Sequence, residues 1–325
     1  MTRKDLLIWH RRIALGLAPF LLLQALTGLL LRIPSPAARV PQGPALPPSA
    51  LIAGAERAAP GFRPFRLDYP PHDAVLARMS DAQGQQLFIR IDPATARVLD
   101  QGSLWHDPWR MALEWHNSLF SGPLGSTIVA MEALGLLLLA ISGLIFWWPG
   151  KGRLRQGLSI PARAPKRLKL RLWHRSTGVL ASALLAMIAI TGILLVWPLI
   201  VPPGGSRVRT DPAPASDLAY ARAAAALPGQ PLRDIRLAPS GHAVFHFAAK
   251  SRNHWDLDTV TLEPDPRITY AADAPALWMR LLPLHTGDAL GIAGQVLIAL
   301  LAFSLLFLII SGVIAWNRAR KGKSK

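Results

Sequence analysis

The chain has 325 residues, of which 51% are hydrophobic and 17% are charged, and its Lys and Arg residues outnumber Asp and Glu by 36 to 19, a net charge of +17. The apolar content excludes an intrinsically disordered chain. The absence of cysteine excludes disulfides, zinc fingers, iron–sulfur clusters and cysteine nucleophiles. The high net charge leaves two interpretations, a nucleic-acid-binding face or the cytoplasmic side of a membrane protein.

Four segments have the roughly 20 apolar residues that a membrane-crossing helix needs. They are residues 13–31, 126–148, 177–200 and 292–316. These segments predict an integral membrane protein. The first apolar segment is longer than the apolar region of a secretion signal, and no clean small-residue cleavage pattern follows it, so we expect it to be retained as a helix.

The positive charge is confined to three short flanks of the apolar segments. Residues 1–12, 149–176 and 318–325 together hold 18 basic residues and one acidic residue, so they carry the whole net charge of +17. An excess of Lys and Arg in short flanks marks the cytoplasmic side. We therefore expect both termini to be cytoplasmic. The flanks lack interleaved stacking aromatics or a recognisable nucleic-acid-binding module, so no nucleic-acid partner is expected.

The sequence contains an internal duplication. Trp-His-Arg at 9–11 leads to Thr-Gly at 27–28, and the same tripeptide at 173–175 leads to Thr-Gly at 191–192. The second and fourth apolar segments share a second pattern, in which a Ser-Gly pair begins 26 residues after a histidine. Two halves with two crossings each would insert the same way up and be related by an axis along the membrane normal.

The predicted fold is an α-helical membrane protein with four transmembrane helices in two parallel repeats, each carrying a small α+β module on the outer side. Each module is expected to contain a short helix, at 48–59 or 215–227, and strands such as 86–91 and 243–247, with a turn at 92–95. The predicted domains in chain order are transmembrane helix 1 with the cytoplasmic N-terminus (1–33), module 1 (34–107), transmembrane helix 2 (108–148), a basic cytoplasmic linker (149–176), transmembrane helix 3 (177–200), module 2 (201–276), transmembrane helix 4 (277–317) and a basic cytoplasmic tail (318–325).

Four of the nine histidines occupy matching places in the repeats, and all four adjoin a predicted membrane crossing. They are His10, His116, His174 and His285. An axis along the membrane normal brings matching residues to equal depth, so His10 can face His174 near the cytoplasmic side and His116 can face His285 near the outer side. Two facing imidazoles in a helix bundle suit the axial ligation of a haem iron. Because cysteine is absent and no Met matches, we expect two bis-His b-type haems. The alternative is that the histidines are interfacial anchors.

Three further residues are candidates for a role beside the histidines. Arg11 and Arg175 follow the cytoplasmic histidines and could bind haem propionates, or they could simply obey the positive-inside rule. Glu132 is the only acidic residue within a span. It could relay a proton, bind a substrate cation or form a hydrogen bond within the bundle.

The distance from His116 to Ser142 predicts a break in the second membrane segment. Twenty-six residues of straight helix span about 39 Å, more than the roughly 30 Å of a hydrocarbon core. We therefore expect the helix to break near residues 121–123, where Pro123 lacks an N–H. Elsewhere, His242, His246 and His254 could bind a metal, although strand histidines are more often unliganded, and His72 and His106 have no evident partners.

These motifs resemble the PepSY-associated transmembrane family of bacterial inner-membrane proteins. The resemblance rests on Trp9-His10-Arg11 with Thr27-Gly28, on residues 91–98, on the Leu-rich helix ending at Ser142-Gly143-Leu144, and on the copies in the second half. It implies PepSY-like periplasmic modules and localisation in the inner membrane. Members of the family include haem-bearing ferric-siderophore reductases. A departure from the family pattern is Ala96, which stands where a glycine usually follows Thr in the turn of the first module.

The resemblance implies electron transfer to a periplasmic ferric siderophore or another iron chelate. The cytoplasmic donor would be a reductase, a flavin or a quinol, and membrane lipid surrounds the spans. Hard oxygen ligands hold iron(II) less tightly than iron(III), so reduction would loosen the metal. Two other classes of function remain open. One is a non-catalytic binding or regulatory membrane protein, and the other is a transport component for iron, copper or haem.

Overall fold

The structure is a computed structural model, and it describes residues 2–33, 43–70, 73–150, 152–200, 216–237, 243–248, 257–262, 268–270 and 277–321. The chain divides into two compact units, a helical unit and an α+β unit. The helical unit contains residues 1–33, 112–201 and 281–325, and the α+β unit contains residues 34–111 and 202–280. Each unit therefore draws on both halves of the sequence.

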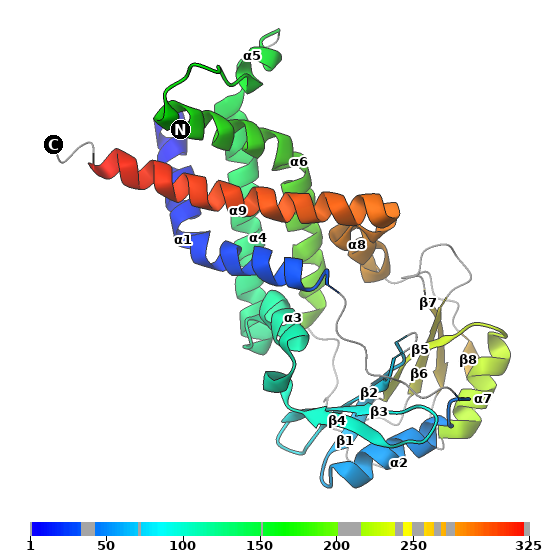
Figure 1. Ribbon diagram of the computed structural model, residues 1–325. Helices are drawn as coiled ribbons and strands as arrows, with labels where there is room; N and C mark the ends of the chain where they lie inside the picture. Colours follow the sequence, from blue (N-terminus) through cyan, green and yellow to red (C-terminus); the bar gives the residue numbers. More distant parts are fainter. Residues whose placement is uncertain are drawn as a thin grey trace. The chain divides into compact units, whose positions relative to one another are not determined.

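Four helices are long and apolar enough to cross a membrane, over Lys4–Leu30, Gly122–Trp147, Leu168–Ile200 and Asp288–Arg318. They belong to α1 (Arg3–Leu30), α4 (Gly122–Trp147), α6 (Lys166–Ile200) and α9 (Gly291–Lys321, with the short η2 at Asp288–Leu290 before it) (Figure 1). The four predicted apolar segments fall on these helices, so the prediction of a four-span membrane protein is confirmed. The chain is a multi-pass membrane protein with one extramembrane β domain.

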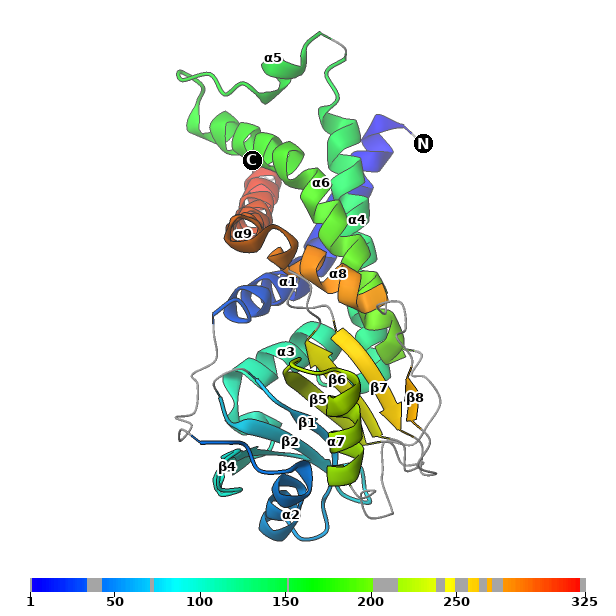
Figure 2. The same ribbon diagram turned by 90° about the vertical axis from the view of Figure 1, so that its right-hand side faces the viewer.

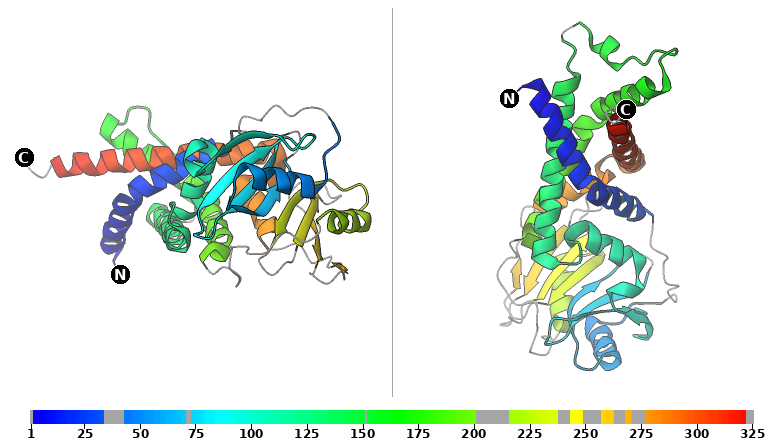
Figure 3. Two further views of the ribbon diagram at one scale, coloured as in Figure 1. Left: turned by 90° about the horizontal axis from the view of Figure 1, so that it is seen from below. Right: turned by 90° about the vertical axis from the view of Figure 1, so that its left-hand side faces the viewer.

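The four long helices pack in a ring, because α4 and α9 each contact both α1 and α6. Their common core consists of small and branched apolar side chains, with Leu21, Leu136, Ala181, Leu185 and Leu301 among the most buried. Many large apolar side chains on these helices remain exposed, including Leu138, Ile141 and Phe303. Exposed apolar surface of this kind suits contact with lipid, because apolar side chains have no free-energy penalty in a hydrocarbon environment. Figure 3 shows these helices from two further directions.

The predicted break in the second membrane segment is confirmed. Helix α3 (Pro108–Ser118) ends before residues 119–121, and α4 begins at Gly122. Leu119, Phe120 and Gly122 all have positive φ angles, which reverse the chain direction there. The second half has an equivalent break between α8 (Leu277–Thr286) and α9, without a proline.

The α+β unit contains a single eight-stranded antiparallel sheet in the order β4-β3-β2-β1-β5-β6-β7-β8. The strands are β1 (Arg63–Asp68), β2 (Val75–Ser80), β3 (Gln86–Ile91), β4 (Val98–Gly102), β5 (Leu232–Leu237), β6 (Ala243–Ala248), β7 (Leu257–Leu262) and β8 (Ile268–Tyr270). The predicted strands 86–91 and 243–247 are therefore confirmed. The short helices are α2 (Pro48–Ala58), α5 (Leu154–Leu158, in the basic linker), α7 (Ser216–Ala226) and η1 (Leu104–His106).

The prediction of two repeats, each with its own module, is wrong. Strand β1 of the first half pairs with β5 of the second half, with Leu67 opposite Ile235, and the two sets of strands form one sheet. The physical reason is that two small sheets would each leave an unpaired edge, whereas pairing β1 with β5 satisfies the backbone groups of both. The α2 and α7 helices cover the same face of this sheet (Figure 2) and share one core with it.

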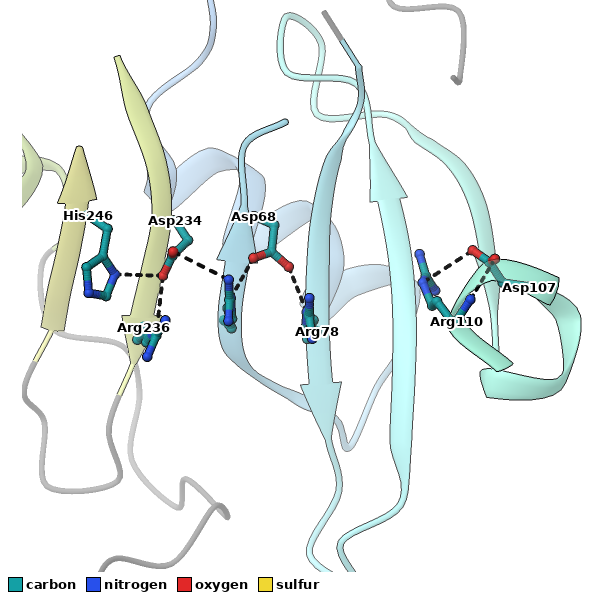
Figure 4. A network of polar contacts seen from close by, with 8 residues as sticks. Asp68, Arg78, Asp107, Arg110, Asp234, Arg236 and His246 are labelled. Atoms are coloured by element: carbon teal, nitrogen blue, oxygen red, sulfur yellow. Dashed lines mark hydrogen bonds and ion pairs between the residues drawn. The ribbon is translucent and has the colours of Figure 1, made fainter. Parts of the chain in front are cut away.

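The two faces of the sheet differ in chemistry because side chains alternate along each strand. Leu67, Ala77, Ile235 and Phe245 point into the core under α2 and α7. The intervening positions place charged side chains on the other face, where they form a ladder of ion pairs across the strands (Figure 4). Asp68 pairs with Arg66 and Arg78 at 2.5 and 2.6 Å, and Asp234 pairs with Arg66 and Arg236 at 3.4 and 3.1 Å.

The turn between β3 and β4 forms despite the alanine at its tightest position. Ala96 has a φ of 56°, in the left-handed region that favours glycine. The buried Asp92 side chain stabilises the turn by accepting hydrogen bonds from the Ala94 N–H and the Thr95 hydroxyl, at 2.8 and 2.6 Å. The predicted turn at 92–95 is therefore confirmed.

Candidate functional site

Each of the four repeat histidines forms a hydrogen bond through Nδ1 to a hydroxyl group on another helix. In the pair of sites nearer the chain termini, His10 on α1 contacts Ser142 on α4 at 2.7 Å, and His174 on α6 contacts Ser311 on α9 at 2.8 Å. At the other end, His116 on α3 contacts Thr27 on α1 at 3.1 Å, and His285 on α8 contacts Thr191 on α6 at 2.9 Å. All four contacts join helices of the same sequence half.

The carbonyl contacts of the hydroxyl groups favour one tautomer of the imidazoles. Each hydroxyl has one proton, and each lies within hydrogen-bond distance of a carbonyl in its own helix, such as Met187 O for Thr191 at 2.8 Å and Leu139 O for Ser142 at 3.2 Å. Thr27 and Ser311 contact carbonyls in the same way. When that proton is donated to the carbonyl, the hydroxyl oxygen can only accept a proton from Nδ1–H of the histidine. The Nε2 lone pair then remains available for a metal.

A glycine follows each of these hydroxyl residues and leaves space for the imidazole ring. A Cβ atom on Gly28 or Gly192 would lie 3.3 or 3.4 Å from Cε1 of His116 or His285. A Cβ atom on Gly312 would lie 3.3 Å from Cε1 of His174, and one on Gly143 would lie 3.8 Å from Cε1 of His10. Each Thr-Gly or Ser-Gly pair therefore forms what we call a histidine seat, in which a hydroxyl group contacts the ring and the neighbouring glycine leaves room for it. The four seats are the pairs at 27–28, 142–143, 191–192 and 311–312.

His10 and His174 line a common cavity of about 360 Å³. The beginnings of α1 and α6 and the ends of α4 and α9 surround this cavity, and its walls are mainly Leu, Ile, Val, Ala and Gly side chains. Arg11 and Arg175 also line it. The four residues predicted for the cytoplasmic site are thus brought together around one apolar space, which is the usual character of a cofactor site.

Two buried hydrogen-bond donors on this cavity have no acceptor within the described part of the chain. They are the Nε atom of Arg175 and the indole Nε1 of Trp147. A second nitrogen of Arg175, Nη2, contacts the Ser159 carbonyl at 3.3 Å. Buried donors are normally paired.

His116 and His285 lie against each other at the opposite end of the helical unit. Their ring centres are 6.3 Å apart and the ring planes are inclined by 72°. Bonds between a metal and an imidazole nitrogen are about 2 Å long, so two rings on opposite sides of one metal ion have their centres about 6 Å apart. The spacing of these two rings is therefore compatible with both imidazoles binding one metal ion.

Two glycines hold the helix breaks that carry His116 and His285. A Cβ atom on Gly125 would lie 1.6 Å from the Ser118 carbonyl oxygen, and one on Gly294 would lie 2.0 Å from the Gly287 carbonyl oxygen. No real Cβ atom tolerates such distances, so only glycine allows the long helix to approach the preceding turn this closely. These contacts set the position of both outer histidines relative to the ring of helices.

Glu132 lies in α4, between the two histidine pairs. Its side chain is buried, with 3% exposed surface, and neither carboxyl oxygen has a hydrogen-bond partner among the described residues. The Gln24 side chain on α1 faces it. Gln24 itself donates through Nε2 to the backbone carbonyl of His116 at 3.0 Å. This hydrogen bond joins α1 to α3 and connects the surroundings of Glu132 with the pair His116 and His285.

The remaining histidines do not form a metal site in the part of the chain that the structure describes. His246 is buried and donates through Nδ1 to Asp234 at 2.9 Å (Figure 4), so it belongs to the ion-pair ladder. His242, His254 and His72 lie outside the described residues. His106 contacts the Ser103 hydroxyl at 3.2 Å. Among the described residues, no three metal-ligating side chains converge.

Two features of the site did not follow from the sequence. The Thr-Gly and Ser-Gly pairs are visible as repeated motifs, but their role as histidine seats requires contacts between residues as far apart as 10 and 142. The ion-pair ladder has a local signal, because Arg and Asp alternate with apolar residues in β1 and β5. That signal indicates a polar face of the sheet but does not indicate which charged side chains form ion pairs with each other.

A comparison with curated proteins gave no match. A comparison with protein families matched the PepSY-associated TM region over residues 7–319. This match includes all four long helices, all four repeat histidines and the α+β unit. Because it covers nearly the whole chain, the protein belongs to the family of the PepSY-associated TM region.

Proposed function

We propose that the protein is a membrane electron-transfer protein that holds two b-type haems and passes electrons from the cytoplasmic side to a ferric chelate, such as a ferric siderophore, in the periplasm. The proposal rests on one hydrogen-bond arrangement that all four repeat histidines share. Each has Nδ1 engaged by a hydroxyl group, which leaves Nε2 free for iron. Histidine ligands in metal proteins are usually oriented by such a partner on the other ring nitrogen.

The residues around His10 and His174 fit a haem. The walls of the cavity are mainly apolar, and Arg175 on its lining suits the carboxylate of a haem propionate. Arg11 adds a second guanidinium on the same cavity. In this proposal His10 and His174 bind the iron, and Arg11 and Arg175 orient the macrocycle through its propionates.

The residues around His116 and His285 fit a second iron centre because of their ring spacing of 6.3 Å. The hydroxyl groups of Thr27 and Thr191 contact Nδ1 of the two rings, an arrangement that suits ligation through Nε2. When bound, the two haems supply one-electron carriers near opposite ends of the helical unit. The protein's own contribution is to orient the ligands, exclude water with the apolar bundle and keep the helix breaks in place through Gly125 and Gly294.

The direction of transfer rests on the distribution of charge. The basic flanks contain all of the net charge of +17, which favours a cytoplasmic position for the His10/His174 end. A cytoplasmic reductase, a flavin or a quinol would donate there. At the outer end, one electron would convert a bound iron(III) chelate to iron(II), and the oxygen ligands of the chelate would release iron(II) more readily.

Anaerobic reoxidation tests this function. The purified protein in detergent is reduced with dithionite, freed of excess reductant and mixed with ferric hydroxamate or ferric catecholate chelates. We expect the haem absorbance to return to the oxidised form, with iron(II) trapped by a ferrous-specific dye in an amount equal to the electrons lost. A protein that retains both haems but is not reoxidised by any ferric chelate would contradict the reductase activity and leave an electron carrier with another acceptor.

Variants with one histidine replaced test the assignment of the sites. His10→Ala and His116→Ala should each remove about one of the two haems, while the control His106→Ala should remove none. If both variants keep two haems, the pairing of the histidines is wrong. A colourless protein from haem-replete cells would favour a binding, regulatory or transport role.

A further inference from the structure

Glu132 is the one titratable side chain within the long apolar segments of the sequence. Residues 13–31, 123–148, 176–200 and 289–317 contain no other Asp, Glu, His, Lys, Arg or Tyr. The position that matches Glu132 in the second half is Leu301, which is buried in the bundle core. An acidic residue retained in such a place costs stability, so its presence points to a function.

The surroundings of Glu132 provide one polar neighbour and no cation. Helices α1 and α6 pack against α4. On α1, the facing polar group is Gln24, whose Oε1 atom also lacks a hydrogen-bond partner within the described residues. On α6, the residues beyond Arg175 are all uncharged. The carboxyl group of Glu132 therefore has no fixed positive charge to neutralise it from either neighbouring helix.

The position of Glu132 is intermediate between the two histidine pairs. Ser142, which contacts His10, lies ten residues further along α4, which corresponds to about 15 Å of helix rise. Leu136, one helical turn away, lines the cavity of His10 and His174. In the other direction, Gln24 joins the surroundings of Glu132 to the His116 backbone. Glu132 is thus placed to respond to a change of charge at the outer iron centre.

Burial and iron charge act on this carboxyl group in opposite directions. An ionised carboxylate without a partner is strongly disfavoured in an apolar interior, where charges interact over long distances. An oxidised iron centre carries one more positive charge than a reduced one and therefore favours the carboxylate. Reduction removes that charge and favours the carboxylic acid. The protonation of Glu132 and the oxidation state of the iron are then thermodynamically linked.

We propose that Glu132 is a proton-binding site that compensates the charge of the electron held at the His116/His285 centre. When the iron at that centre changes from iron(III) to iron(II), the Glu132 carboxylate takes up one proton from water and forms an O–H bond. When the electron leaves for the ferric chelate, the proton is released. The electron comes from the cytoplasmic donor, so each turnover moves one electron through the protein and leaves Glu132 unchanged. This inference rests on the proposed haem function.

Spectroelectrochemical titration of the haem-loaded protein between pH 5.5 and pH 9 tests the linkage. For a one-electron centre that is fully coupled to one proton, the equilibrium constant of reduction falls tenfold per pH unit, which corresponds to about 59 mV. We expect the potential of one of the two haems to fall with rising pH over part of this range. In Glu132→Gln that dependence should be lost, and the potential should stay near the value of the unchanged protein at low pH.

Glu114→Gln is the matched control. Glu114 lies on α3, two residues before His116, and contacts the Ser118 hydroxyl. Its removal should leave the pH dependence in place. If Glu114→Gln abolishes the dependence and Glu132→Gln does not, the proton-binding site is elsewhere and the inference is overturned. A potential that is independent of pH in the unchanged protein overturns it as well.

Infrared difference spectra provide a readout that does not depend on the potential. The reduced-minus-oxidised spectrum should contain a carboxylic acid C=O band that shifts in heavy water, is absent in Glu132→Gln and persists in Glu114→Gln. The absence of this band from a protein that carries both haems refutes the inference and leaves the proposed function intact. A protein that binds no haem refutes both.

Discussion

The most specific consequence of the site geometry concerns the hydroxyl groups that hold the histidines. Thr191→Val keeps the shape of the side chain and removes the oxygen that accepts the proton of His285 Nδ1 at 2.9 Å. The loss removes one hydrogen-bond partner of the buried imidazole and leaves the ring less firmly held in its orientation. Removal of such an outer partner typically lowers metal affinity by about 10- to 100-fold, or roughly 1.4 to 2.8 kcal/mol.

Haem titration of the apoprotein measures this loss. Thr191→Val should weaken binding at the outer site by the stated factor and leave the inner site at full affinity, so that one of two haems is lost on dilution. Ser311→Ala, which removes the partner of His174, should show the opposite pattern. Thr127→Val is the control, because its exposed hydroxyl contacts only the Pro123 carbonyl in its own helix, at 2.8 Å.

Two results would refute the reasoning. One is full haem affinity at both sites in Thr191→Val and Ser311→Ala. The other is an equal loss in Thr127→Val, which would show that removal of any hydroxyl from these helices is harmful. A change in the reduced absorption spectrum without a change in affinity would indicate that the hydroxyl groups orient the rings but do not strengthen the iron bond.

Two further outcomes follow from the structure. Gly125→Ala places a Cβ atom 1.6 Å from the Ser118 carbonyl oxygen and should displace the helix break, with loss of the outer haem and a lower unfolding temperature in detergent, whereas Gly16→Ala, with open space around it, should not. In the α+β unit, burial raises the pKa of Asp234, but the hydrogen bond from His246 and the nearby guanidinium groups outweigh it and lower the pKa from 3.8 to about 2. A lowered pKa stabilises the folded state by about 2 kcal/mol above pH 4, and this stabilisation disappears as the pH falls toward 2. The thermal unfolding temperature of Asp234→Asn should therefore depend less on pH in that range than that of the unchanged protein. An unchanged pH dependence would contradict the assignment.

Local sequence patterns were sufficient to predict several elements of this fold. Apolar length predicts the four spans because the membrane thickness imposes it. The mismatch between 26 residues of helix and that thickness predicts the break before Gly122. The alternating pattern at 86–91 predicts β3. Each of these follows from interactions within a few residues of one another.

The joining of the two halves into one sheet was not predictable from such patterns. It depends on the pairing of β1 with β5, two edges separated by more than 160 residues, and each half alone has the pattern of a complete small module. The burial of apolar faces under α2 and α7 is equally compatible with one sheet or two. Whether one sheet or two sheets form depends on the pairing of the edge strands, and the pattern of side chains contains no signal for that pairing.

The four histidines of the candidate site could be predicted from the sequence, but their hydrogen-bond partners could not. The matching positions of His10, His116, His174 and His285 follow from the repeat. The Thr and Ser hydroxyl groups were visible in the same repeat, yet a hydroxyl in a helix usually bonds to its own backbone. Only the packing of α1 against α3 and α4, and of α6 against α8 and α9, gives them a second role as partners of the histidines.

The central claim is that the four histidines hold two haems, and the absorption spectrum of the purified protein tests it most directly. Protein from haem-replete cells should contain about two haems per chain by the pyridine haemochrome method and should give sharp α and β bands on reduction, as expected of iron with two histidine ligands. A protein without a haem spectrum, or one whose haem remains when His10, His116, His174 and His285 are all replaced by alanine, would contradict the account.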